Sequence, residues 1–163
     1  MNMVTIGFGG GCHWCTESVF KALRGVTQVS QGYIQSLPPH HSFSEAVVVN
    51  YDDRAIALDL LIEIHLRTHA STSNHKMRGK YRSAIYTFSQ TQAWEADNIL
   101  AKLQDEFEKK LVTQILPHRA FKASDERFVN YGEKNADGPF CKAYIDPKLS
   151  LLREEYRKWV KSP

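Results

Sequence analysis

Apolar and polar positions alternate in three short segments near the start of the chain, which is the pattern of strands with one buried face. These segments cover residues 4–8, 26–34 and 44–51. Between the first two, apolar residues recur at helical spacing from about His13, and Gly25 follows the expected end of that helix. The sequence therefore predicts a strand, a helix and two further strands, in this order.

The rest of the chain continues with a helix and a strand and then adds shorter elements. The expected elements are a helix over 56–66, a strand over 81–88, an amphipathic helix over 90–110, a strand over 112–116, a helical turn over 125–131 and a terminal helix over 147–159. This order predicts an α+β fold: a two-layer sandwich with a ferredoxin-like split βαβ core, a mainly antiparallel sheet and extra C-terminal segments. With 163 residues, of which 42% are hydrophobic, we expect a single domain over 1–163.

Charge and composition narrow the classes of function. The formal net charge is only +3, and the basic residues are spread along the chain, which argues against a nucleic-acid partner. No segment approaches the roughly 18 consecutive apolar residues that span a bilayer. The start, MNMVTIGFGGG, lacks the basic region and long apolar stretch of a secretion signal. We therefore expect a cytoplasmic protein that binds neither nucleic acid nor membrane. We also expect a monomer.

The segment FGGGCHWCTESVF, residues 8–20, carries two of the three cysteines. Cys12 falls at or just before the N-terminus of the first predicted helix, where unpaired backbone N–H groups and the helix dipole favour a thiolate. The three glycines before it let the backbone approach the sulfur and can point N–H groups at a bound oxygen. The odd number of cysteines favours free thiols over a disulfide framework. The segment is therefore interpreted as a reactive-thiol site.

Two features of this segment allow other interpretations. Cys12, His13 and Cys15 can bind a metal ion, but a structural zinc site needs four ligands, and Cys141 stands alone far downstream. Trp14 either walls an apolar pocket for a methyl or thioether group or packs as an ordinary helix residue.

Four motifs, in order, resemble those of a known family. GGGCHWCTESVFKALRGV, the pair Gly32-Tyr33, SEAVVVNYD and KYRSAIY are similar to the A-type peptide methionine sulfoxide reductases, whose patterns are G-C-F-W-x-x-E, G-Y, G-H-A-E-V-V-x-V-x-Y-D and G-T-Q-Y-R-S-A-I-Y. The match extends from residue 4 to about residue 149. The resemblance implies the two-layer α+β fold of that family. It also implies reduction of methionine S-sulfoxide, in peptides, proteins or free, and thus protein repair under oxidative stress.

The resemblance also assigns roles to individual residues. Cys12 corresponds to the nucleophile that attacks the sulfoxide sulfur, Glu45 to the acid that protonates the sulfoxide oxygen, and Tyr81 to a hydroxyl that binds this oxygen. Release of methionine leaves Cys12 as a sulfenic acid, which a second thiol condenses into a disulfide. Cys141 is the favoured second thiol and Cys15 the alternative. No bound cofactor is expected, because a thioredoxin-like protein or dithiothreitol would reduce the disulfide.

The chain departs from the family pattern around the expected site. His13 replaces a phenylalanine that packs on the substrate methyl group, so we place His13 and Trp14 in substrate binding. The imidazole either stabilises the thiolate or changes recognition of the methyl group. Lys76 replaces an aspartate, Phe43 replaces a histidine, and the loop before Glu45 is shortened.

These departures keep two alternative functions open. The first is a divergent thiol oxidoreductase, or a reductase of another small sulfoxide, on the same scaffold. The second is a non-catalytic module that binds metal through cysteine and histidine.

Overall fold

The computed structural model describes residues 2–162. Its elements in chain order are β1 (Met3–Gly9), α1 (His13–Lys21), β2 (Val26–Gln35), β3 (Ser44–Asp52), α2 (Leu58–Arg67), η1 (Lys76–Gly79), β4 (Ala84–Thr87), α3 (Gln90–Leu103), η2 (Gln104–Glu106), β5 (Gln114–Pro117), β6 (Ala120–Ala123), α4 (Tyr131–Lys134), η3 (Cys141–Ile145), α5 (Asp146–Glu155) and η4 (Arg157–Trp159). None of the helices within residues 2–162 combines the length and the apolar character needed to cross a membrane.

The strands form one sheet in the order β5-β4-β1-β3-β2-β6. The four inner strands, β4-β1-β3-β2, have the order of a ferredoxin-like split βαβ unit, and β5 and β6 extend its two edges. Only β4 and β5 pair in parallel, because α3 carries the chain back across the sheet between them. The predicted α+β fold with a mainly antiparallel sheet is confirmed.

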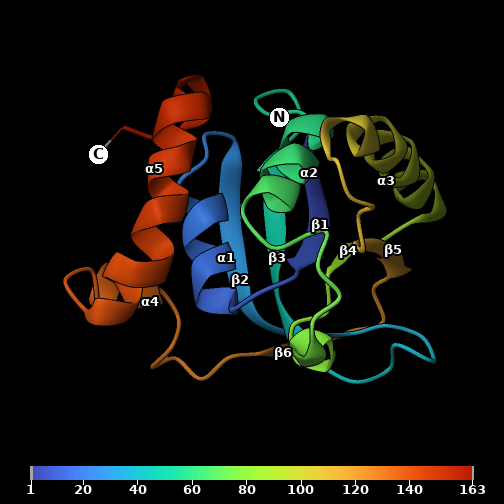
Figure 1. Ribbon diagram of the computed structural model, residues 1–163, viewed down its shortest axis with the longest axis horizontal. Helices are drawn as coiled ribbons and strands as arrows, with labels where there is room; N and C mark the ends of the chain where they lie inside the picture. The colour runs from blue at the N-terminus through green and yellow to red at the C-terminus, as the bar shows by residue number, and fades with distance from the viewer. Residues whose placement is uncertain (1, 163) are drawn as a thin grey trace.

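The strands alternate between two faces of this sheet. Val47 and Val49 of β3 belong to the main core beneath the helices, whereas Ala46 belongs to a smaller core on the other face. Figure 1 shows α1 and α2 across one face of the sheet, with α5 beside α1 and α3 beside α2. The fully buried rings of Phe8 and Phe20 stack with centroids 4.5 Å apart, which fixes α1 on β1.

Two elements in the second half differ from the prediction. α3 ends at Leu103 and not near residue 110. The Gln104 side chain explains this end, because it accepts a hydrogen bond from the N–H of Leu111 at 2.9 Å and donates one to the carbonyl of Lys109 at 3.0 Å. These bonds stabilise a returning loop in place of further helix. β6 was not predicted, because its four residues, two half-buried and two exposed, carry too little alternation to indicate a strand.

The turn between β1 and α1 depends on a glycine. Gly10 has φ of +155°, and a Cβ atom there would overlap the ring of His69. A residue with a side chain is therefore disfavoured at this position. β1 lies between β3 and β4, so this turn brings the start of α1 to the beginning of β3.

Candidate functional site

Cys12 is the residue from which α1 begins. Its carbonyl accepts hydrogen bonds from the N–H groups of Cys15 at 3.1 Å and Thr16 at 3.2 Å. The pKa of Cys12 is lowered, first because the Cys15 thiol donates a hydrogen bond to its sulfur and then because the N–H of Trp14 points at it. Burial and the nearby charge of Glu45 act in the opposite direction. The predicted thiolate position at a helix N-terminus thus has a physical basis in this structure.

The fold brings the three cysteines together. Cys15 and Cys141 are buried in one small cluster with Ile145, and Cys12 packs against it. All three are free thiols. The pKa of Cys15 is raised, first by its hydrogen bond to Cys12 and then by burial, and burial also raises the pKa of Cys141. Cys15 and Cys141, the two thiols considered for disulfide formation, therefore both lie in the cluster against which Cys12 packs.

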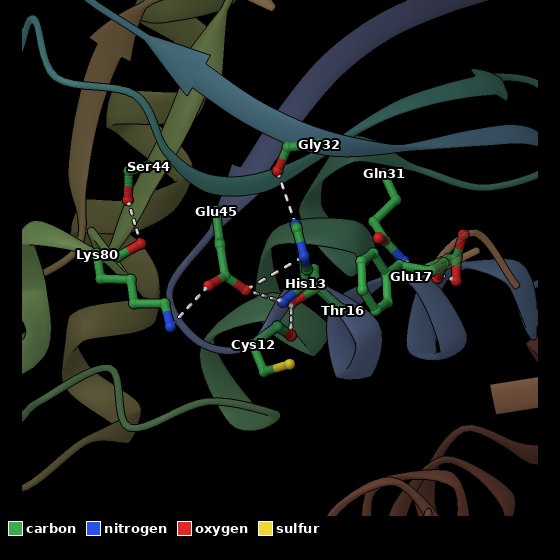
Figure 2. Close-up of polar contacts among 10 residues, drawn as sticks. Cys12, His13, Thr16, Glu17, Gln31, Gly32, Ser44, Glu45 and Lys80 are labelled. Carbon is green, nitrogen blue, oxygen red and sulfur yellow. Dashed lines mark hydrogen bonds and ion pairs between the residues drawn. The ribbon is translucent and has the colours of Figure 1, made fainter. Parts of the chain in front are cut away.

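Glu45 lies at the start of β3, on the face that carries the helices. Glu45 is only 6% exposed, and its Oε1 accepts a hydrogen bond from the backbone N–H of His13 at 3.2 Å. Nε2 of His13 lies 3.4 Å from the same oxygen, and Nζ of Lys80 lies 3.7 Å from Oε2. Figure 2 shows the carboxylate between these two side chains. A buried acid is thus fixed beside the residue that follows Cys12.

The ring of His13 is directed at the sheet. Nδ1 lies 2.8 Å from the carbonyl oxygen of Gly32 in β2, and the ring meets that of Tyr33 edge-on, with centroids 5.1 Å apart. Figure 2 shows the sulfur of Cys12 pointing away from this imidazole. The polar partner of His13 is therefore Glu45 and not the sulfur of Cys12.

The lysine beside the acid is Lys80, which the sequence did not single out. Lys76, which replaces an aspartate of the family pattern, is exposed in η1. The ammonium of Lys80 lies 5.2 Å from the centroid of the Tyr81 ring. The pKa of Lys80 is raised, first by its hydrogen bond with the Tyr81 hydroxyl and also by the charge of Glu45. The only sequence signal for Lys80 was its position directly before Tyr81.

The comparisons with known proteins agree with this geometry. The sequence model of the family described as peptide methionine sulfoxide reductase matches residues 4–160. The chain belongs to this family. It is 33% identical to the peptide methionine sulfoxide reductase MsrA of Psychrobacter sp. (strain PRwf-1), over 97% of this chain and 99% of the relative. It is also 33% identical to the MsrA of Deinococcus radiodurans, over 91% of this chain and 80% of the relative.

Solved structures of the same family share the fold. Reduced Mxr1 from Saccharomyces cerevisiae superposes with a TM-score of 0.74 at 24% identity, covering 87% of this chain and 91% of that one. Methionine sulfoxide reductase A of Corynebacterium diphtheriae gives a TM-score of 0.72 at 23% identity, covering 83% of this chain and 76% of that one. The family model and the relatives at 33% identity make the chain an oxidoreductase of the peptide methionine sulfoxide reductase family, and the solved structures show that it has the same fold.

In this family member, aromatic side chains from residues 128–140 pack against Trp14. The indole stacks on Tyr131 with ring centroids 3.9 Å apart and on Phe128 at 5.6 Å, and the edge of Phe140 meets it at 5.2 Å. Trp14 is therefore part of an aromatic cluster that joins α1 to the segment before Cys141.

Two histidines, the buried His65 and the half-buried His69, support the glycine turn of the reductase. One ring nitrogen of His65 lies 2.8 Å from the carbonyl oxygen of Gly9, and Nε2 of His69 lies 2.8 Å from Oγ of Ser83. Burial lowers the pKa of His65 to about 4 and that of His69 well below its ordinary value. Over residues 2–162, no three His, Cys, Asp or Glu side chains are grouped so that they could hold a metal ion. Both histidines are thus neutral parts of the scaffold that holds the turn.

Proposed function

We propose that this protein reduces methionine S-sulfoxide, free or in peptides and proteins, with Cys12 as nucleophile and Glu45 as proton donor. One observation supports this most strongly. The thiol with a lowered pKa begins α1, and the N–H of the next residue, His13, binds the buried carboxylate of Glu45 at 3.2 Å. The start of α1 thus carries the nucleophile, Cys12, and through His13 it also holds the acid, Glu45.

The reaction needs both groups. The Cys12 thiolate attacks the sulfoxide sulfur, and Glu45 gives a proton to the sulfoxide oxygen, which is a poor leaving group without it. The substrate loses its S–O bond and leaves as methionine, reduced by two electrons. The oxygen and the proton remain on Cys12 as sulfenic acid, so Cys12 is oxidised by the same two electrons.

Tyr81 and Trp14 are proposed to position the substrate. The Tyr81 hydroxyl lies beside Lys80, whose ammonium approaches Oε2 of Glu45 at 3.7 Å. A sulfoxide oxygen bound at this edge of the acid can therefore accept hydrogen bonds from both side chains. The half-buried indole of Trp14 supplies apolar surface for the methyl group at the end of α1 nearest Cys12.

Cys141 is proposed to resolve the sulfenic acid. Its thiol attacks the Cys12 sulfur, which forms a disulfide and releases water, and Cys15 is the competing thiol. A cavity of about 340 Å³ between α1, α4 and η3 has Cys141 in its wall. The neighbour Mxr1 has been solved in complex with Trx2, which supports a thioredoxin-like reductant for this chain as well. We place this cycle in a monomeric, cytoplasmic repair enzyme that acts under oxidative stress.

A second substrate class is favoured by one observation. His13 and Lys80 place two polar side chains around the acid, where an apolar pocket would suit a methionine side chain. A small, more polar sulfoxide is therefore the alternative substrate. Competition between such sulfoxides and methionine S-sulfoxide distinguishes the two.

The direct test is turnover of methionine S-sulfoxide and R-sulfoxide by the purified protein with dithiothreitol, beside Cys12→Ser. The proposal predicts methionine from the S-epimer alone and none with Cys12→Ser. Turnover of neither epimer, or equal turnover by Cys12→Ser, contradicts it.

A further inference from the structure

We propose that Arg78 is a positioning residue for sulfoxide reduction, because its guanidinium holds the turn before Cys12 and the backbone of Tyr81 at a fixed separation. This inference rests on the proposed roles of Cys12 and Tyr81. The hydrogen bonds of Arg78 go to backbone carbonyls, so it acts through the residues that it binds and not on the substrate.

One nitrogen of the guanidinium joins two segments of the site. Nη1 of Arg78 donates to the carbonyl oxygens of Gly10 at 2.8 Å and Tyr81 at 2.9 Å. Because both oxygens bind the same nitrogen, they lie within about 6 Å of each other. Gly10 lies two residues before Cys12, and Tyr81 carries the hydroxyl proposed to bind the sulfoxide oxygen. A single side chain thus links the backbones that carry the nucleophile and the oxygen-binding hydroxyl.

Two further bonds fix the guanidinium itself. Nε of Arg78 donates to the carbonyl of Ser73 at 2.9 Å, and Nη2 donates to the carbonyl of Ala70. A guanidinium is planar and its donors have fixed directions, so bonds to four carbonyls determine its position. Within residues 2–162, no ion pair forms at Arg78 that would draw the guanidinium elsewhere. Arg78 is therefore held by its own loop, and it holds in turn the two backbones that Nη1 joins.

The turn before Cys12 is held at two successive carbonyls. The carbonyl of Gly9 lies 2.8 Å from a ring nitrogen of His65, and the carbonyl of Gly10 accepts the bond from Arg78. Glycine has more backbone freedom than any other residue, and three glycines precede Cys12. These two bonds therefore restrict the path of the chain into the nucleophile.

Arg78 also distinguishes this chain from the family pattern. The pattern G-T-Q-Y has a glycine three residues before the tyrosine, where this chain, with R-G-K-Y, has Arg78. A glycine has no side chain with which to bind the carbonyls of Gly10 and Tyr81. The link between the two backbones is therefore a feature of this chain, in a loop that also carries Lys76 in place of an aspartate.

The test compares Arg78→Gly and Arg78→Lys with the wild type in single turnovers of methionine S-sulfoxide. At saturating substrate, we expect both variants to release methionine about 10- to 100-fold more slowly, because a shift of about 1 Å in a catalytic group can cost 10²-fold and an ammonium cannot replace the directed donors of a guanidinium. The half-saturating substrate concentration should change by less than about threefold. The matched control is Arg24→Gly, which removes a bond to the carbonyl of Val160 beyond the far end of α1 and should react at the wild-type rate.

Two readouts separate positioning from general support of the fold. Guanidinium chloride at about 50 mM, where its denaturing effect is small, should raise the rate of Arg78→Gly at least about threefold and should not raise that of Arg78→Lys, whose side chain fills the space. Alkylation of Cys12 in Arg78→Gly should stay within about twofold of wild type, because the lowered pKa of Cys12 depends on Cys15 and Trp14.

Three results overturn the proposal. The first is a rate for Arg78→Gly within about twofold of wild type, or a loss confined to substrate binding. The second is the absence of rescue by guanidinium. The third is a slowing of Cys12 alkylation equal to that of methionine release, because Arg78 would then act on the thiol and not on its separation from Tyr81.

Hydrogen exchange tests the link without turnover. The N–H groups of Tyr81 and Cys15 are bound to the carbonyls four and three residues before them, at 2.9 and 3.1 Å. Both should exchange about tenfold faster or more in Arg78→Gly and in Arg78→Lys, because each segment loses its tie to the other. Unchanged exchange at either amide overturns the link even if the protein reduces sulfoxides. Faster exchange at both, together with no methionine from the wild type, leaves the link intact and rejects the proposed reaction.

Discussion

Oε1 of Glu45 accepts a hydrogen bond from the backbone N–H of His13 across 3.2 Å, which fixes the acid of β3 to the residue that follows Cys12. A backbone donor has no rotamer freedom, so the carboxylate and the start of α1 move as one unit. The distance between nucleophile and acid is therefore set by sheet and helix packing and does not depend on a mobile loop.

Glu45→Gln should remove proton donation while keeping this hydrogen bond. We expect a loss of about 10²- to 10⁴-fold in the rate of methionine release in a single turnover, the range of general acid catalysis. Alkylation of Cys12 at neutral pH should not slow, because the charge of Glu45 raises the pKa of Cys12 and the variant lacks that charge. A rate of methionine release within about threefold of wild type would remove Glu45 from the mechanism.

Cys15→Ala and Cys15→Ser should separate the hydrogen bond from the thiol. The Cys15 thiol is the first cause of the lowered pKa of Cys12, so alanine should slow alkylation of Cys12 by iodoacetamide at about pH 7, by roughly tenfold if the pKa rises by one unit. Serine retains a donor and should restore part of the rate. Equal alkylation profiles for alanine and wild type would show that Cys15 does not activate Cys12.

Cys141→Ser should stop recycling by thioredoxin while leaving the first turnover intact. The variant should release methionine once and accumulate sulfenic acid on Cys12, which dimedone traps and mass spectrometry detects. The matched control is Cys15→Ser, which should keep thioredoxin-dependent turnover. The reverse result, with Cys15→Ser inactive and Cys141→Ser active, would assign resolution to Cys15.

Gly10→Ala should destabilise the turn before the nucleophile. A methyl group there overlaps the ring of His69, and φ is +155°, so we expect a loss of about 1–3 kcal/mol in the free energy of unfolding. Gly11→Ala is the matched control, because a Cβ atom at Gly11 has no neighbour within 4 Å. Denaturant unfolding of both variants decides this, and equal stabilities would contradict the account of the turn.

We expect the fold to lose stability in mild acid because His65 is buried. The pKa of His65 is about 4 in the fold and near 6.5 in the unfolded chain, so the unfolded state binds more protons between these values. The stabilisation is complete above pH 6.5 and is lost as the pH falls through 4, by about 3 kcal/mol for His65 alone. Urea unfolding over this range should show a smaller loss for His65→Gln. An identical pH dependence in the variant would exclude His65 as the cause.

The sequence predicted the inner sheet well, because alternation along β1, β2 and β3 is strong and their faces are buried. β6 was missed because its pairing with β2 is decided by tertiary contact and not by its own pattern. The order of the motifs identified Cys12 and Glu45 as candidate catalytic residues. They are 33 positions apart in the chain, so the sequence did not indicate which side chains lie between them in space.

The pairing of His13 with Glu45 was not predicted, because it depends on the register of two strands. Gly32 and Glu45 lie in adjacent strands, where Tyr33 of β2 is opposite Glu45 of β3. The ring of His13 reaches both strands only because α1 begins above them. Lys80 was missed for a similar reason, since a loop lysine gives no periodic signal.

The most direct test of the reaction is a single turnover without reductant. Reduced protein is mixed with excess methionine S-sulfoxide, and methionine is counted by chromatography while mass spectrometry locates the oxidised thiols. We expect one methionine per chain, the loss of two thiols and a disulfide that includes Cys12, with no methionine from Cys12→Ser. Methionine formed without oxidation of Cys12, or oxidation of Cys12 without methionine, would contradict it.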